Sequence, residues 1–194
     1  MRIFIFLIFI SLAASGLSAQ DLSKELDNNT AFYEGEKVSY IISPPDDFVM
    51  VEHEAEVDGY AFAFIPDGEK YDSASVRIGV NIFRIKEGME QKITLEDVIH
   101  EDTTALREHF GETLIVYEVD SIITKSYFPI RNLYLNDTTR FIPNVMMSYL
   151  RGGNEILIFG LTIDLDYPRF MAEQIYTDCL KKIKVLVKGK LETG

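Results

Sequence analysis

The segment that most constrains the fold of this chain runs from residue 145 to residue 163, where two apolar stretches flank a short turn. Val145–Leu150 precedes the turn, Arg151-Gly152-Gly153-Asn154 forms it, and Glu155–Ile163 follows it. Two apolar runs around a glycine pair are typical of an antiparallel β-hairpin. The second run is apolar at successive positions, Ile156 to Phe159, so we expect it to be a central strand with both faces buried.

The rest of the chain predicts further strands, separated by turn signals such as Pro44-Pro45-Asp46-Asp47 and Pro66-Asp67-Gly68. In Tyr60–Ile65 the large side chains alternate with alanines, which predicts a strand with one bulky face made by Tyr60, Phe62 and Phe64. The predicted strands are Val38–Ile42, Phe48–Glu52, Tyr60–Ile65, Val76–Ile82, Thr113–Ile123 and Tyr127–Leu135.

Residues 95–110 are expected to form an amphipathic helix. Thr94 and Asp97 make a capping-box pattern at its start, and Gly111 follows its end. Acidic residues crowd the N-terminal half, where the helix dipole favours anions. The residues of its apolar face are Val98, Ile99, Leu106 and Phe110.

A second helix is predicted from Pro168, which suits a first helical turn because its missing N–H costs nothing there. Asp164 or Asp166 is expected to cap it, in preference to binding calcium. Its apolar stripe is Met171, Ile175, Cys179 and Ile183, widened by Leu180 and Val187, with lysines towards the C-terminal end. The order of elements predicts an α+β fold, with a mainly antiparallel β-sheet flanked by helices.

The first twenty residues have the features of a secretory signal peptide. Arg2 is the only charge there, Ile3–Leu12 is almost entirely apolar, and small residues follow. We expect cleavage after Ala19 or Ser18; an uncleaved membrane anchor is the alternative. The predicted organisation is a signal peptide over residues 1–19, a lead-in over residues 20–37 and one α+β domain over residues 38–194. The protein is therefore expected to be exported, periplasmic or secreted, and free of the membrane once cleaved.

Composition excludes several classes of function. The chain of 194 residues has a net charge of -12, and a strongly acidic chain is a poor partner for nucleic acid. One cysteine permits no disulfide framework within the chain and no multi-cysteine metal site.

The sequence predicts no catalytic, cofactor-binding or metal-ligating residue, and no cofactor. His100 and His109 are nine residues apart, so they face opposite sides of the predicted helix. His53 stands between Glu52 and Glu54; on a strand the glutamates would share one face and the histidine the other, which favours a solvated edge over a metal site. Cys179 is expected to be an inert core thiol.

Several features together resemble the PsbP-like α/β/α sandwich, shared by the extrinsic photosystem protein, the Ran-binding Mog-type factor and small exported bacterial proteins. The resemblance extends from about Val38 to Val187. The first feature is Ile78-Gly79-Val80, followed by a helix that begins at Thr94-Leu95-Glu96-Asp97. The second is Phe141-Ile142-Pro143 before the hairpin, and the third is a closing helix with Lys182-Ile183-Lys184-Val185-Leu186. Because members of that family mostly act as non-enzymatic binding or assembly factors, the resemblance implies that role.

The predicted function is an exported, non-enzymatic binding or assembly module whose partner is another protein, bound through exposed aromatic residues or a sheet edge. Two alternatives stay open. The 13 phenylalanines and 10 tyrosines are compatible with a carrier of a small apolar ligand, and an enzyme could use a site assembled from distant residues such as His53 and a carboxylate.

Overall fold

The computed structural model describes residues 29–137 and 144–188. The strands in these ranges are β1 (Ala31–Glu34), β2 (Val38–Ile42), β3 (Phe48–Val51), β4 (Phe62–Pro66), β5 (Val76–Arg84), β6 (Leu114–Ile123), β7 (Pro129–Asp137), β8 (Asn144–Gly152), β9 (Glu155–Ile163) and β10 (Lys184–Val187). The helices are α2 (His53–Val57), α3 (Leu95–Phe110), α4 (Arg169–Lys182) and the short 3₁₀ helix η1 (Tyr71–Ser73).

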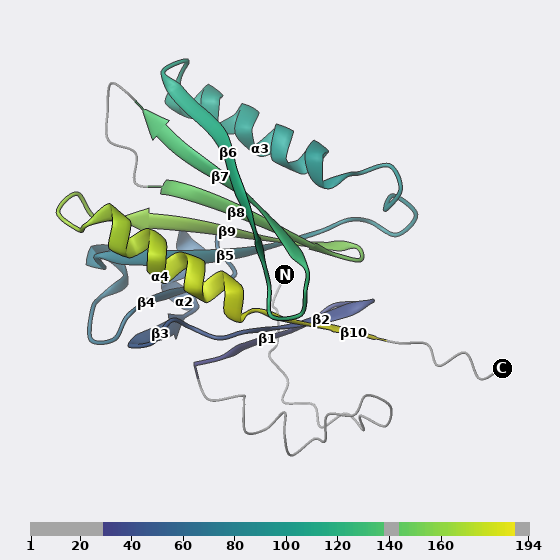
Figure 1. Cartoon of the computed structure of the whole chain (residues 1–194), viewed down its shortest axis with the longest axis horizontal. Coiled ribbons are helices and arrows are strands. Elements are labelled where there is room, and N and C mark those ends of the chain that lie inside the picture. The colour runs from purple at the N-terminus through teal and green to yellow at the C-terminus, as the bar shows by residue number, and fades with distance from the viewer. Residues whose placement is uncertain (1–28, 138–143, 189–194) are drawn as a thin grey trace.

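The strands form two antiparallel sheets (Figure 1). The large sheet has seven strands in the order β3-β4-β5-β9-β8-β7-β6, and the small sheet has three in the order β1-β2-β10. The predicted fold class, α+β with a mainly antiparallel sheet flanked by helices, is confirmed.

The hairpin at residues 144–163 and its central strand are also confirmed. β8 and β9 pair in antiparallel register from Gly152 and Glu155 onwards, and β9 is the middle strand of the large sheet. Successive side chains of β9 enter opposite faces: Leu157 and Phe159 join the main core, whereas Ile156 packs in a separate cluster on the other face. This explains why the sequence of β9 is apolar without alternation.

The two faces of the large sheet are covered by different elements. One face carries α4 and the small sheet, and the core between them includes Tyr176 of α4, Tyr40 of β2 and Phe159 of β9. The opposite face carries α3 towards the β6 end and α2 with η1 towards the β3 end. Figure 1 shows α3 and α4 lying along the large sheet, with the small sheet beyond α4.

Helix α3 begins and ends where the sequence predicts. The hydroxyl of Thr94 accepts a hydrogen bond from the main-chain amide of Asp97 at 3.1 Å, and a carboxylate oxygen of Asp97 accepts one from the amide of Thr94 at 2.8 Å. This reciprocal capping box stabilises the first turn, and Gly111 ends the helix at a φ of 91°.

The prediction for the closing helix is wrong in three respects. The helix ends at Lys182, and the residues that follow form β10, which pairs with β2. Its buried residues are Ala172, Tyr176, Cys179 and Leu180, whereas Met171 is exposed. No aspartate side chain caps it: Pro168 is the N-cap residue, and Asp164 instead accepts a hydrogen bond from the amide of Leu165.

Further differences concern the first half of the domain. Ala31–Glu34 lies in the predicted lead-in but forms β1, which pairs with β2. His53 begins the helix α2 rather than lying on a strand. Phe62 and Phe64 share the core face as predicted, but Tyr60 precedes β4 and packs on the opposite side with Ala63. The predicted signal peptide and the Phe141-Ile142-Pro143 segment lie outside the described residues.

Candidate functional site

Strand β6 lies at one edge of the large sheet and pairs with β7 alone among the described strands. It is ten residues long. The strand at the other edge, β3, has four residues. An edge strand leaves main-chain N–H and C=O groups unpaired along its outer side, and these groups can pair with an additional strand. β6 therefore offers the longer of the two edges.

Apolar side chains are exposed along this edge. Ile115 and Tyr117 are each 46% exposed, Ile123 is 52% exposed, and Tyr127 in the turn to β7 is 87% exposed. We call these four residues the β6 edge surface. Tyr127 also has a φ of 65°, in the left-handed region that a tyrosine adopts at a cost. Exposed apolar residues that gather on one edge are typical of an interaction surface.

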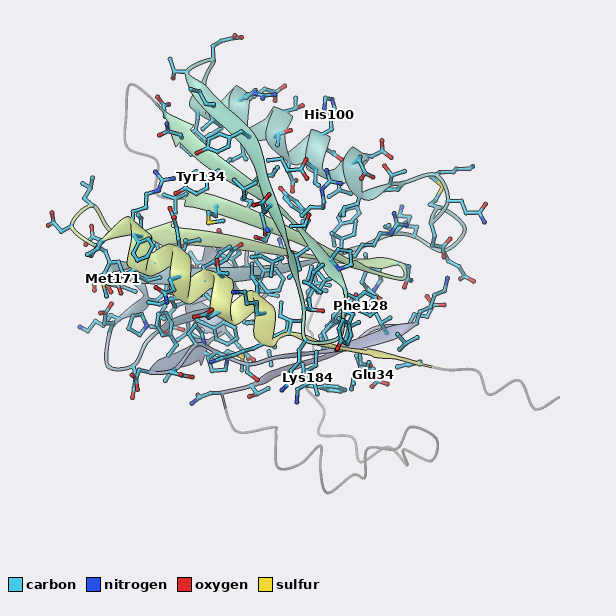
Figure 2. All side chains as sticks on the ribbon, viewed as in Figure 1. Glu34, His100, Phe128, Tyr134, Met171 and Lys184 are labelled. Carbon is cyan, nitrogen blue, oxygen red and sulfur yellow. The ribbon has the colours of Figure 1, made fainter. Side chains whose placement is uncertain are left out.

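An aromatic and cationic stack connects the β6 edge surface to α4. The rings of Tyr117 and Tyr134 are stacked with their centroids 5.3 Å apart. The guanidinium of Arg169, at the start of α4, lies 4.3 Å from the centroid of Tyr134, and its Nε donates to the hydroxyl of Tyr134 at 2.9 Å. Figure 2 shows Tyr134 between α4 and β6. Phe170, the next residue of α4, is exposed.

Burial perturbs the charges beside this stack. The Nε of Arg169 also donates to Glu173 Oε1 at 2.9 Å. Partial burial lowers the pKa of Arg169 and raises the pKa of Glu173. The hydrogen bonds of Arg169 to Glu173 and Tyr134 hold the guanidinium over the Tyr134 ring.

The far end of β6 is anchored to the rest of the molecule. The amide of Lys125, in the β6–β7 turn, donates to the carbonyl of Lys181 at 2.9 Å, and the hydroxyl of Ser126 accepts from the amide of Val185 at 2.9 Å. The register is irregular between Val119 and Ile122, as in a β-bulge. There Asn132 Nδ2 donates to the carbonyl of Asp120 at 2.9 Å. The edge is therefore held in place at both its turn and its irregularity.

The other face of β6 carries two exposed carboxylates, which follow the core residues Leu114 and Val116 along the strand. Glu118 accepts hydrogen bonds from Arg131, which also donates to Glu96 of α3 at 3.1 Å, and the arginine lowers the pKa of Glu118. Asp120 lies two residues further along β6 and is exposed. β6 thus presents the exposed Ile115 and Tyr117 towards the α4 face and the exposed Glu118 and Asp120 towards the α3 face. An incoming strand would meet both sets in alternation.

The histidines and the cysteine that were considered as possible catalytic residues do not lie together. His53, His100 and His109 are all exposed, the first on α2 and the other two on α3. Figure 2 shows His100 on α3. Cys179 is fully buried in the core, and burial raises the pKa of its thiol to about 12. A thiol with such a pKa is protonated at neutral pH, so it is a poor nucleophile.

Residues 29–137 and 144–188 hold no cluster of three or more His, Cys, Asp or Glu arranged to bind a metal ion. None of the helices in those ranges has the length and apolar character needed to cross a membrane.

The bulky residues Phe62 and Phe64 are buried in the main core, which also includes Phe159.

Sequence reasoning did not single out Tyr117, Tyr134 and Arg169. Tyr117 and Tyr134 oppose each other in the β6–β7 register, and Arg169 lies 35 residues after Tyr134. The sequence predicts the strand Thr113–Ile123, but no local signal shows that it lies at an edge.

No protein-family model matches the chain, and no curated protein matches it by sequence. Among solved structures, the chain is similar to cyanobacterial PsbP (CyanoP) from Synechocystis sp. PCC 6803, with 12% sequence identity and a TM-score of 0.49. The similarity covers 90% of this chain and 98% of that chain.

Proposed function

We propose that this protein is a non-enzymatic binding module that recognises an extended segment of another protein by adding it as a strand to the free edge of β6. The observation that carries the proposal is a ten-residue edge strand with exposed Ile115, Tyr117 and Ile123 along it. Main-chain hydrogen bonds would supply affinity, and the alternating side chains would supply specificity.

The chemistry of β6 defines the partner segment. Its residues that point towards the α4 face would be apolar, because they would pack against Ile115 and Tyr117. Its residues that point towards the α3 face would be basic, because Glu118 and Asp120 lie on that side. The net charge of -12 favours a basic partner at longer range as well.

The compartment belongs to the same proposal. The protein would act after export, in the periplasm or as a secreted protein, with residues 1–19 removed. The apolar run at Ile3–Leu12 and the small residues after it support export. The mass of the protein isolated from its own host tests this part independently of binding.

The experiment that tests partner binding is site-specific photocrosslinking in the native host. A photoreactive phenylalanine analogue replaces Tyr117 in one version of the protein and Val57 in the control version. Val57 is also exposed, but it lies on α2, near the opposite edge of the sheet. We expect a specific crosslink from position 117 alone, mapping to a segment with alternating apolar and basic residues.

Two charge reversals complete the test. Asp120→Lys should weaken the crosslink at position 117 because it repels a basic segment, whereas Asp67→Lys, at the exposed β4–η1 turn, should leave it unchanged. Equal crosslinking from positions 117 and 57, or crosslinking only to a second copy of this chain, would overturn the proposal.

A further inference from the structure

A polar pocket lies near the opposite end of the large sheet from β6. It has a volume of about 220 Å³. Its floor consists of residues from three neighbouring strands, Ala63 of β4, Gly79 of β5 and Thr162 of β9, and its walls are Asp58, Tyr60, Tyr71 and Arg77. Drug-sized ligands occupy pockets of roughly 300–1,000 Å³, so this pocket suits a smaller molecule.

The sheet carries small side chains at this point, and the ring of Tyr60 packs against them. Gly79 has no side chain, and a Cβ there would lie 2.5 Å from the ring of Tyr60. The ring of Tyr60 therefore lies directly over the main chain of β5. Tyr71 is buried in the small cluster under α2, with its hydroxyl donating to Asp58 Oδ2 at 2.8 Å. The two tyrosines give the pocket aromatic walls.

Opposite charges meet at the mouth of the pocket. Arg77 Nη1 lies 3.5 Å from Asp58 Oδ2, at the limit of a hydrogen bond, and the guanidinium lies 5.0 Å from the centroid of Tyr71. The side chains of Arg77 and Asp58 are 25% and 47% exposed. The pair is thus close enough to be held together by charge, yet accessible to a solute.

Both charged groups keep unused hydrogen-bonding capacity. Across the described residues, Arg77 makes no hydrogen bond through Nε or Nη2, and Asp58 accepts none at Oδ1. The hydroxyl of Tyr60 likewise makes none within residues 29–137 and 144–188. A guanidinium with free donors is suited to a carboxylate, and a carboxylate with a free oxygen is suited to an ammonium group.

We propose that this pocket binds a small zwitterion of the α-amino acid type, with its carboxylate on Arg77 and its ammonium on Asp58. A zwitterion matches the site better than an anion or a cation alone, because either single charge would face a like charge a few ångströms away. The aromatic walls of Tyr60 and Tyr71 would contact the aliphatic part of the ligand. This site is independent of the β6 edge, so either proposal can fail without the other.

The test is a titration of the ¹⁵N-labelled mature protein followed by NMR, with glycine and L-alanine as probes and acetate and methylammonium as single-charge controls. We expect saturable shifts at the amides of Gly59, Tyr60 and Arg77 with glycine or alanine. The controls should bind at least about tenfold more weakly, since each lacks one charged hydrogen-bonding group.

Variants then assign the binding groups. Arg77→Gln and Asp58→Asn should each weaken glycine binding by about tenfold or more, whereas Arg84→Gln, on the same strand and outside the pocket, should leave it unchanged. The Asp58→Asn variant is expected to remain folded, because the asparagine still provides an acceptor for the hydroxyl of Tyr71. No saturable shift with either amino acid, acetate binding as tight as glycine, or full binding by a folded Asp58→Asn variant would overturn the proposal.

Discussion

The carboxylate of Glu155 accepts a hydrogen bond from the main-chain amide of Glu36 at 3.1 Å, and so joins the start of β9 to the turn between β1 and β2. Glu155 is fully buried. Its Oε1 also lies 3.7 Å from Arg84 Nε, while its Oε2 makes no hydrogen bond to any described residue and lies against Gly35. One carboxylate therefore connects the small sheet to the central strand of the large sheet.

Replacing Glu155 should destabilise the protein. Glu155→Ala leaves the amide of Glu36 without its acceptor, and a lost buried hydrogen bond costs about 1–3 kcal/mol of unfolding free energy. Glu155→Gln keeps a carbonyl oxygen in place and should cost less. Urea unfolding measures both, with Glu54→Ala on the exposed side of α2 as the control. A loss equal to that of the control would show that the contact contributes nothing.

Gly152 and Tyr40 form a second connection between the two sheets. The hydroxyl of Tyr40 donates to the carbonyl of Gly152 at 3.1 Å, and a Cβ on Gly152 would lie 2.2 Å from that hydroxyl oxygen. Gly152→Ala should therefore cost about 1–3 kcal/mol of unfolding free energy, because Tyr40 is fully buried and has no room to move. Adding Tyr40→Phe removes the nearest clashing atom, whereas Val38 Cγ2 would still lie 2.9 Å from the new Cβ.

The double variant Tyr40→Phe with Gly152→Ala should thus recover part of the stability that Gly152→Ala loses, although Tyr40→Phe alone is destabilising. A thermodynamic cycle of the four proteins, measured by urea unfolding, gives the coupling. Strictly additive losses would contradict the predicted clash.

The stability of the protein should depend on the charge of Asp102. Asp102 is a residue of α3, and its partial burial raises the pKa of its carboxyl, even though a hydrogen bond from Tyr149 acts in the opposite direction. Because its folded pKa exceeds the unfolded value, deprotonation disfavours the folded state. Stability from this group is therefore present at low pH and is lost as the pH rises through the folded pKa.

Asp102→Asn keeps an acceptor for Tyr149 and removes the charge. It should raise the unfolding free energy at pH 7, and the gain should shrink towards zero below about pH 4. Glu108→Gln, an exposed position on the same helix, is the control. A gain that does not change between pH 4 and pH 7 would show that the charge is not its cause.

The thiol of Cys179 should be unreactive in the folded protein. Burial raises its pKa to about 12, and its Sγ contacts the carbonyl of Ser43 at 3.6 Å. A disulfide reagent at pH 8 should label it at the rate of unfolding, whereas labelling in concentrated urea should be complete within mixing. Fast labelling without denaturant would mean that the core around α4 opens readily.

Short sequence patterns predicted the helices and turns whose bounds depend on contacts within a few residues. Thr94, Asp97 and Gly111 fix the bounds of α3 by hydrogen bonds and dihedral angles within a few residues. The hairpin is fixed in the same way, because β8 ends at Gly152 and the turn begins at Gly153, which has a φ of 63°. The sequence of β9 predicted its central position because a strand that is buried on both faces has apolar residues at successive positions.

Non-local contacts explain what the sequence did not predict. Ile183 and Val187 continue the apolar spacing of α4, so a helix through them was a reasonable prediction, yet β10 pairs with β2 more than 140 residues earlier. The candidate sites also depend on contacts between residues that are not neighbours in the sequence. Arg77 meets Asp58, and Arg169 meets Tyr134, only because the sheet order brings them together.

The strand order β1-β2-β10 also determines when β2 can complete its pairing during synthesis of the chain. All five residues of β2 are buried, but one of its two neighbours is the last described strand. During synthesis from the N-terminus, β2 stays without that neighbour until residues 184–187 have left the ribosome. A nascent or truncated chain that lacks residues 184–187 therefore leaves one edge of the apolar strand β2 unpaired, which makes it a target for chaperones and proteases.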